Sequence, residues 1–95
     1  MANRRIASLR PKFTDLQGQY LAFMQAYIAL HGVAPAEADL QRFFRVTPPA
    51  VHRMVLALEQ RELLERVPGR SRSVRLLLPA NEIPKLERRG NDGAF

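Results

Sequence analysis

Apolar and aromatic positions recur at helical spacing near the start of this 95-residue chain. Within residues 14–31 they lie three or four positions apart, as one face of an amphipathic helix requires. They are Leu16, Tyr20, Phe23, Met24, Tyr27, Ile28 and His31. Thr14 and Gln17 have the spacing of a capping box, and Gly32 suits a left-handed helix end. The pattern predicts one long helix over 14–31.

Two shorter helices are predicted next, separated by a turn of three residues, 45–47. The first covers residues 36–44. The second runs from Thr47 to Arg61, with Thr47 as its cap and Pro48 at the first helical position, where a missing N–H costs nothing. Its buried face is predicted to be Val51, Met54, Val55 and Leu58. Two short helices joined by such a turn form a helix-turn-helix unit.

Alternating apolar residues then predict a β-hairpin, with strands over 63–67 and 73–78. Pro68-Gly69 favours a type II turn, because proline suits its second position and glycine its third. The predicted fold class is mainly α with a small β-hairpin (α+β). It is a winged helix-turn-helix with a three-helix core and a two-stranded wing.

We expect three regions along the chain: a basic arm over 1–12, the winged domain over 13–79, and a flexible tail over 80–95 with one helical turn near 83–88. The net charge is +6, and residues 1–12 and 66–78 each hold four basic residues and no acid. Clustered positive charge attracts a polyanion, most often nucleic acid. The chain has no cysteine, no apolar run long enough to span a membrane and no secretion signal, so we expect a cytoplasmic protein.

The third helix and the wing supply the candidate DNA-binding residues. If its apolar side faces the core, the groove-reading side presents Pro49, His52 and Arg53 near the N-terminal end. Arg53 could bind guanine with two hydrogen bonds, and His52 could donate or accept at a base edge. The full set is Thr47, Pro49, His52, Arg53, Arg70, Ser71, Arg72, Arg75 and Arg45. The wing arginines are expected on phosphate or in a narrow minor groove, and Thr47 with free N–H groups on phosphate.

Other chemistry finds little support in the sequence. The two histidines lie far apart and form no metal-binding motif, and no catalytic triad, phosphate loop or dinucleotide fingerprint is present. The aromatic residues at helical spacing are interpreted as core, not as a ligand pocket. We therefore expect no enzyme activity, no cofactor, no small-molecule ligand and no membrane partner.

Several segments also look familiar. They are Gly32 to Pro35, Asp39-Leu40, Val46 to His52, Leu58-Glu59 and Leu64 to Leu76. Together they resemble the N-terminal DNA-binding domain of LexA-type repressors, and more loosely MarR-type regulators. The resemblance implies that Thr47, Pro49, His52 and Arg53 face the groove and that residues 69–73 form the wing.

The chain departs from that family at three positions: Ala36 replaces a Ser or Thr cap, and Arg45 and Glu62 replace glycines. No serine–lysine dyad can be assigned, so self-cleavage is not expected. The predicted function is a sequence-specific double-stranded DNA-binding transcriptional regulator, taken as a repressor, acting as a homodimer or as paired monomers. Two alternatives stay open: a protein-interaction module using Leu56 and the aromatic first helix, and a nonspecific or mobile-element-associated DNA binder.

Overall fold

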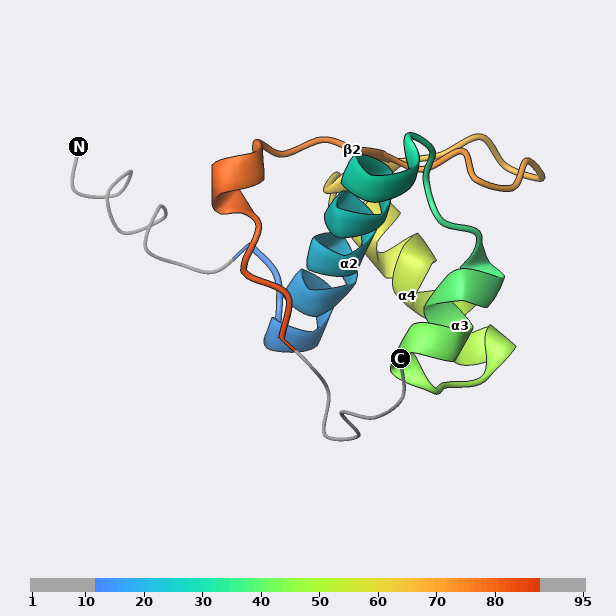
Figure 1. The fold of residues 1–95 in the computed structure, drawn as a ribbon. Helices are drawn as coiled ribbons and strands as arrows, with labels where there is room; N and C mark the ends of the chain where they lie inside the picture. Colours follow the sequence, from blue (N-terminus) through green and yellow to red (C-terminus); the bar gives the residue numbers. More distant parts are fainter. Residues whose placement is uncertain (1–11, 88–95) are drawn as a thin grey trace.

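The computed structural model describes residues 12–87, and Figure 1 shows their arrangement. Within that range three α-helices are followed by an antiparallel hairpin and a 3-10 turn. The elements are α2 Asp15–His31, α3 Glu37–Phe44, α4 Pro48–Gln60, β1 Leu64–Glu65, β2 Arg75–Leu76 and η1 Ala80–Glu82. The predicted three-helix core with a two-stranded wing is confirmed. Residues 1–11 of the predicted arm and 88–95 of the predicted tail lie outside the described residues.

Helix α2 begins and ends as the sequence predicts. The Thr14 hydroxyl accepts a hydrogen bond from the Gln17 N–H at 3.1 Å, and the Gln17 side-chain oxygen accepts one from the Thr14 N–H at 2.9 Å. Gly32 follows the helix with a φ of 76°, a left-handed conformation that glycine adopts without a steric penalty. Both ends of α2 are therefore encoded locally.

The buried side of α2 is wider than predicted. Tyr20 and Met24 are buried as expected, but Leu16 is 43% exposed, and Leu21, outside the predicted face, is fully buried. The reason is that α2 is covered on more than one side: by the other helices and, along Ala22, by a segment from the far end of the chain. A single amphipathic face cannot describe such a helix.

One hydrophobic core joins the three helices and the hairpin. Its fully or nearly fully buried members are Tyr20, Leu21, Met24, Leu40, Val51, Val55, Leu58, Leu63 and Leu64. Tyr20 stacks on Phe44 with ring centroids 4.0 Å apart, and Phe23 lies 4.3 Å from Phe43. The aromatic residues therefore pack α2 against α3 and form part of the core, not a ligand pocket. Of the predicted buried face of α4, only Met54 remains partly exposed.

Helix α3 begins without a capping side chain on Ala36, and Asp39 takes over that role. The Asp39 carboxylate accepts a hydrogen bond from the Ala36 N–H at 2.8 Å. At the other end Arg45 has a φ of 59°, and its N–H donates to the Gln41 carbonyl at 2.8 Å. Arg45 thus occupies a backbone position that favours glycine. The turn then reaches Thr47, which caps α4 as predicted.

The hairpin is antiparallel but short. Its register pairs Leu64 with Leu76 and Glu65 with Arg75. The predicted strands were longer, over 63–67 and 73–78. The difference arises in the wing loop, where side-chain hydrogen bonds take the place of the regular ladder.

That loop is closed by a turn and by one serine. The Arg70 N–H donates to the Val67 carbonyl at 3.0 Å, and Gly69 has a φ of 80°, as the type II turn predicted for Pro68-Gly69 requires. The Ser73 hydroxyl accepts a hydrogen bond from the Val67 N–H at 2.9 Å. This bond satisfies a backbone donor that a longer strand would have paired.

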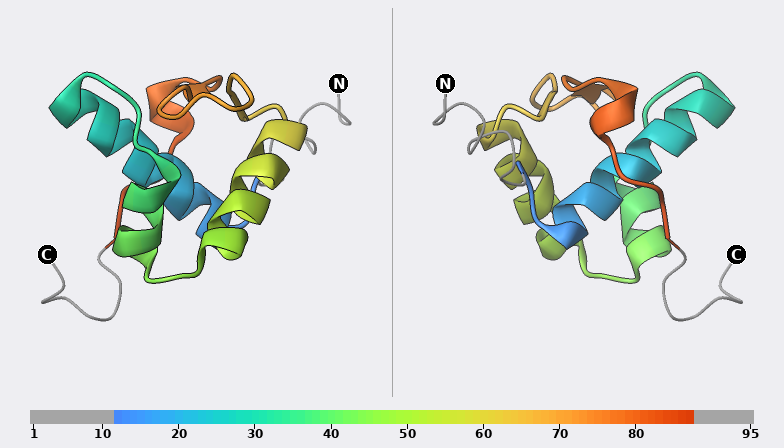
Figure 2. Two further views of the ribbon diagram at one scale, coloured as in Figure 1. Left: turned by 90° about the vertical axis from the view of Figure 1, so that its right-hand side faces the viewer. Right: turned by 90° about the vertical axis from the view of Figure 1, so that its left-hand side faces the viewer.

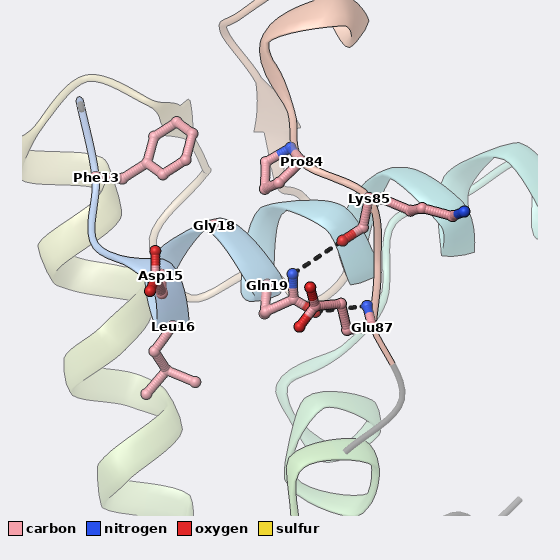
Figure 3. Close-up of a pocket in the computed structure, with 8 residues that line it drawn as sticks. All are labelled: Phe13, Asp15, Leu16, Gly18, Gln19, Pro84, Lys85 and Glu87. Atoms are coloured by element: carbon pink, nitrogen blue, oxygen red, sulfur yellow. Dashed lines mark hydrogen bonds between the residues drawn. The ribbon is translucent and has the colours of Figure 1, made fainter. Parts of the chain in front are cut away.

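Residues 79–87, which we call the strap, run back along α2 on the side away from the wing (Figures 1 and 2). Gln19 is buried, and its side-chain amide holds the strap backbone (Figure 3). Its Nε2 donates to the Lys85 carbonyl at 3.0 Å, and its Oε1 accepts from the Glu87 N–H at 2.7 Å. The helical turn lies at 80–82, not near 83–88 as predicted, because the strap continues in an extended conformation.

Gly18 allows the strap to approach α2. A Cβ atom added there would lie 2.9 Å from the Pro84 side chain and 3.0 Å from that of Phe13. Between the strap and the first turn of α2 is a hollow of about 590 Å³ (Figure 3). The described part of the predicted tail is therefore packed against the domain.

Candidate nucleic-acid interface

The outward face of α4 has the orientation that its sequence predicts. Pro49, His52 and Arg53 are exposed, while Val51 and Val55 on the opposite face are fully buried. A helix that is anchored on one side and open on the other near its N-terminal end has the form of a groove-reading helix. No other described part of the chain covers this face.

The start of α4 offers fewer phosphate-binding groups than the sequence analysis expected. Pro48 and Pro49 carry no N–H, the Ala50 N–H donates to the Thr47 hydroxyl at 3.4 Å, and the Val51 N–H donates to the Thr47 carbonyl at 3.1 Å. The expectation of free backbone N–H groups at this end is wrong. Thr47 itself is exposed, so its side chain remains accessible.

The wing carries its basic residues in two different states. Arg70 and Ser71 are exposed at the tip, and the side chain of Arg70 makes no hydrogen bond or ion pair with residues 12–87. Arg75 is paired across the hairpin with Glu65, and Arg66 with Glu59 of α4 at 3.0 Å. Most of the wing's positive charge is therefore already neutralised within the domain.

Arg72 points back into the domain and does not project from the wing. Its Nη1 donates to the Tyr27 hydroxyl at 3.0 Å, to Asp39 Oδ2 at 3.2 Å and to the Ala34 carbonyl at 3.4 Å. Its φ of 58° is left-handed, a conformation that costs a residue with a side chain of order 1–3 kcal/mol. These contacts, which we call the Arg72 clasp, fix the wing to the junction of α2 and α3.

Asp39 joins the clasp to the start of α3. Partial burial raises its pKa, but the hydrogen bond from the Ala36 N–H and the positive charges of Arg72 and Arg42 lower it more. The net result is a pKa below the ordinary value of an aspartate, so the carboxylate stays charged where it caps the helix and holds Arg72. The sequence analysis assigned Asp39 and Tyr27 no contact with the wing. An acid three residues after Ala36 was a signal for the cap, but the contact with Arg72 depends on tertiary structure.

Three arginines have no hydrogen-bond or ion-pair partner for their side chains among residues 12–87. They are Arg45 in the α3–α4 turn, Arg53 on the outward face of α4 and Arg70 at the wing tip. The wing tip and the α3–α4 turn lie on the same side of the molecule, opposite the strap (Figure 1). The unpaired arginines among the described residues therefore belong to α4, to the turn before it and to the wing tip.

A groove of about 450 Å³ separates the wing from the helices on this side. It is lined by the start of α3, by His52 and Val55 of α4, and by residues 69–74 of the wing. In this groove His52 Nδ1 lies 3.1 Å from Glu37 Oε2. The sequence analysis named His52 but did not predict its contact with Glu37. The two residues lie on different helices, 15 positions apart in the sequence.

A short helix, a tight turn and an exposed capped helix, followed by a basic hairpin on the same side, define a winged helix-turn-helix domain. The profile of the LexA DNA binding domain family matches residues 10–73. The chain belongs to this family. The resemblance noted from the sequence is therefore confirmed.

Three relatives give the scale of the similarity. The LexA repressors of Thermosipho melanesiensis and Thermosipho africanus are each 36% identical over 66 residues, which is 70% of this chain and 33% of theirs. That of Thermotoga maritima is 32% identical over 63 residues, 66% of this chain and 32% of the relative. The chain thus spans about a third of the length of the curated relatives it matches.

Two further kinds of site were sought within residues 12–87. No helix there is both long and apolar enough to cross a lipid bilayer. Nor does that range contain a group of three or more His, Cys, Asp or Glu side chains placed to hold a metal ion.

Proposed function

We propose that this chain binds double-stranded DNA at specific sequences and acts as a transcriptional repressor. The observation that carries the proposal is the shared orientation of three features: the outward face of α4, the wing tip and the unpaired arginines. The family match and the name of the LexA repressors that this chain resembles support the same function. Residues 47–61 would occupy the major groove, and the wing, residues 67–75, would lie along the neighbouring phosphates or minor groove.

Each candidate residue has a role in this proposal. Arg53 donates two hydrogen bonds to guanine, and Pro49 and His52 lie against neighbouring base edges. Thr47 and Arg45 contact phosphates beside the start of α4. Arg70 and Ser71 contact phosphates from the wing, and Arg75 adds to their positive field.

For Arg72 we propose a different role from the phosphate contact that the sequence analysis gave it. Its three acceptors, Tyr27, Ala34 and Asp39, all lie within the domain. Arg72 would therefore act through the wing, by holding the loop that carries Arg70 and Ser71 at a fixed angle to α4. A wing fixed in this way loses less conformational entropy when it binds DNA.

We further propose that two copies bind paired half-sites. A single domain of this size contacts only one major-groove segment, and helix-turn-helix proteins gain affinity by binding two half-sites about one helical turn apart. A selected sequence that contains an inverted repeat would support this proposal. A selected sequence with a single half-site would contradict it.

The test is selection from a random duplex library, followed by titration of the wild type and of Arg53→Ala. The proposal expects one recurring motif and loss of preference at one base pair in the variant. When the motif is placed over a promoter, the protein should lower transcription from it. Binding without any recurring motif would favour a nonspecific binder, and no binding even at low salt would favour a protein-interaction module.

A further inference from the structure

His52 is the one base-facing candidate whose side chain is held by another residue of the described chain. Its Nδ1 lies 3.1 Å from Glu37 Oε2, and the two side chains come from different helices, α4 and α3. They stay accessible, with 51% of the His52 side chain and 40% of the Glu37 side chain exposed. The contact therefore lies at the surface where DNA would bind, inside the groove between wing and helices.

The chemistry of the pair decides which ring nitrogen carries the proton. An ionised carboxylate can only accept hydrogen bonds, so His52 Nδ1 must carry a hydrogen to bind Glu37. In neutral His52 this leaves Nε2 without a hydrogen, as an acceptor. In protonated His52 both nitrogens carry hydrogens, so Nε2 becomes a donor while the bond to Glu37 persists.

Base edges in the major groove distinguish these two states. Cytosine N4 and adenine N6 present amino groups, which donate to an acceptor. Guanine presents only acceptors, N7 and O6, and thymine presents the acceptor O4. Adenine presents the acceptor N7 as well, so it can meet either state of Nε2. Cytosine can meet only an acceptor, and guanine and thymine can meet only a donor.

We propose that Glu37 is a specificity-positioning residue: it makes neutral His52 a reader of adenine or cytosine, and protonation of His52 admits guanine and thymine and excludes cytosine. This inference rests on the proposed function, because it assumes that α4 lies in the major groove. It goes beyond that function in naming what His52 reads and how Glu37 and the proton set the choice.

Other charges in the groove do not obscure this switch. Arg66, Arg70 and Arg72 line the groove with Glu37 and His52. Arg66 is paired with Glu59, and Arg72 with Asp39, whereas Arg70 has no partner among residues 12–87. Among the side-chain types that line this groove, histidine is the one whose ordinary pKa lies between 5 and 8.

The chain provides its own control in His31. This second histidine ends α2, and its ring packs on Tyr27 with centroids 4.2 Å apart. No carboxylate among the described residues pairs with it. A change that acts through Glu37 must therefore alter His52 and leave His31 unaffected.

The first measurement is nitrogen-15 NMR of the histidine rings in the free protein at pH 8. Wild-type His52 should carry its hydrogen on Nδ1. In Glu37→Gln that fixed state should be lost, because an amide can donate as well as accept, and His31 should show the same spectrum in both proteins. A His52 ring with its hydrogen on Nε2 in the wild type would overturn the inference without any DNA being present.

The second measurement is library selection at pH 8 and at pH 5. For the wild type, one position of the motif should reject guanine and thymine at pH 8, and at pH 5 it should accept them and reject cytosine, with relative enrichment shifting about fivefold to tenfold. Glu37→Gln should relax that position at pH 8 and leave the others unchanged. Glu62→Gln, the same substitution at an exposed acid far from the groove, should behave as the wild type.

The outcomes separate this inference from the function beneath it. If the wild type selects the same motif at both pH values and Glu37→Gln selects it too, the proposed role of Glu37 is overturned. The proposal of sequence-specific binding would still stand. A wild type that returns no motif at either pH contradicts the proposed function, and the inference falls with it.

Discussion

The two sides of this domain use their polar side chains differently. On the strap side, Gln19 binds the strap backbone twice, Lys12 pairs with Glu82, and Arg61 donates to the Lys12 carbonyl at 2.7 Å. On the wing side, Arg53 and Arg70 are exposed and find no acceptor among residues 12–87. Polar groups that are satisfied internally hold the fold together, and those that are not satisfied are available to a partner. The comparison therefore supports the proposal that DNA binds on the wing side.

The wing side itself contains a smaller version of the same contrast. Arg70 and Arg72 are two positions apart in the sequence, yet the Arg70 side chain has no partner among residues 12–87 and Arg72 is bound to Tyr27 and Asp39. Charge clustering finds both residues but cannot separate them. In the proposed function, Arg70 therefore contacts a phosphate and Arg72 holds the wing in place.

The largest expected effect is on base recognition. Arg53→Ala should weaken binding to the selected duplex by about 1–3 kcal/mol, because an arginine bound to guanine through two hydrogen bonds contributes that much discrimination. Fluorescence anisotropy with the selected duplex and with a one-base variant measures it. Lys85→Ala, which removes an exposed positive charge from the strap, is the matched control and should leave both affinities unchanged. Equal losses of affinity in Arg53→Ala and Lys85→Ala would contradict the proposal that DNA binds on the wing side.

The next effect is on stability and belongs to the strap side. Gln19→Ala removes two hydrogen bonds to the strap and should lower the free energy of unfolding by about 1–2 kcal/mol. Urea denaturation measures this, with Gln60→Ala at the exposed end of α4 as a control that should change little. Where the variant is fully folded, its affinity for DNA should equal that of the wild type. A loss of affinity would connect the strap with DNA binding.

Substitution of Arg70 and of Arg72 should change the salt dependence of DNA binding to different extents. Arg70→Ala should reduce the slope of log affinity against log salt by about 1, because one phosphate contact is lost. Arg72→Ala should weaken binding to all duplexes with a smaller change in slope, since it releases the wing without removing a contact. If Arg72→Ala changes the slope as much as Arg70→Ala, the clasp opens on DNA and Arg72 binds phosphate directly.

Asp39 makes the clasp sensitive to acid. Its pKa in the folded protein lies below the ordinary value of 3.8, so in this range the unfolded chain binds more protons than the folded one. The stability that its carboxylate provides is therefore complete above about pH 4 and is lost as pH falls through the lower, folded-state pKa. Asp39→Asn should remove this part of the pH dependence in thermal denaturation, while Asp15→Asn at an exposed acid should keep it.

The smallest expected effect is on stability, at two residues with strained backbones on opposite sides of the domain. Glu62 and Arg45 have φ values of 62° and 59°, where glycine is favoured. Replacing either with glycine should stabilise the protein by about 0.5–1 kcal/mol, after the added freedom of the unfolded chain is subtracted. Only Arg45→Gly should also weaken DNA binding. Calorimetry and a duplex titration test the pair, and an equal loss of affinity in Glu62→Gly would contradict the assignment of sides.

Local signals were sufficient to predict most of the fold. The Thr14–Gln17 capping box, Thr47 before Pro48 and the Pro68-Gly69 turn each act within a few residues, so the sequence reveals them directly. The outward face of α4 followed from helical periodicity for the same reason. Arg45 and Glu62 stand where the family has glycine, and both have a positive φ in the structure.

The features that the sequence did not reveal depend on contacts between distant segments. The strap reaches α2 across 66 positions from Lys85 to Gln19, and Arg72 reaches Asp39 across 33. No spacing rule connects such residues. The same limit explains why neither the contact of His52 with Glu37 nor that of Arg72 with Asp39 was predicted.

Titration of the isotopically labelled protein with the selected duplex, followed by amide NMR, tests the central assignment most directly. Signals from residues 45–53 and 69–73 should shift or broaden as DNA is added, while those of the strap, residues 79–87, stay in place. Shifts confined to the strap and the exposed side of α2, with the α4 face and the wing tip unchanged, would contradict the account.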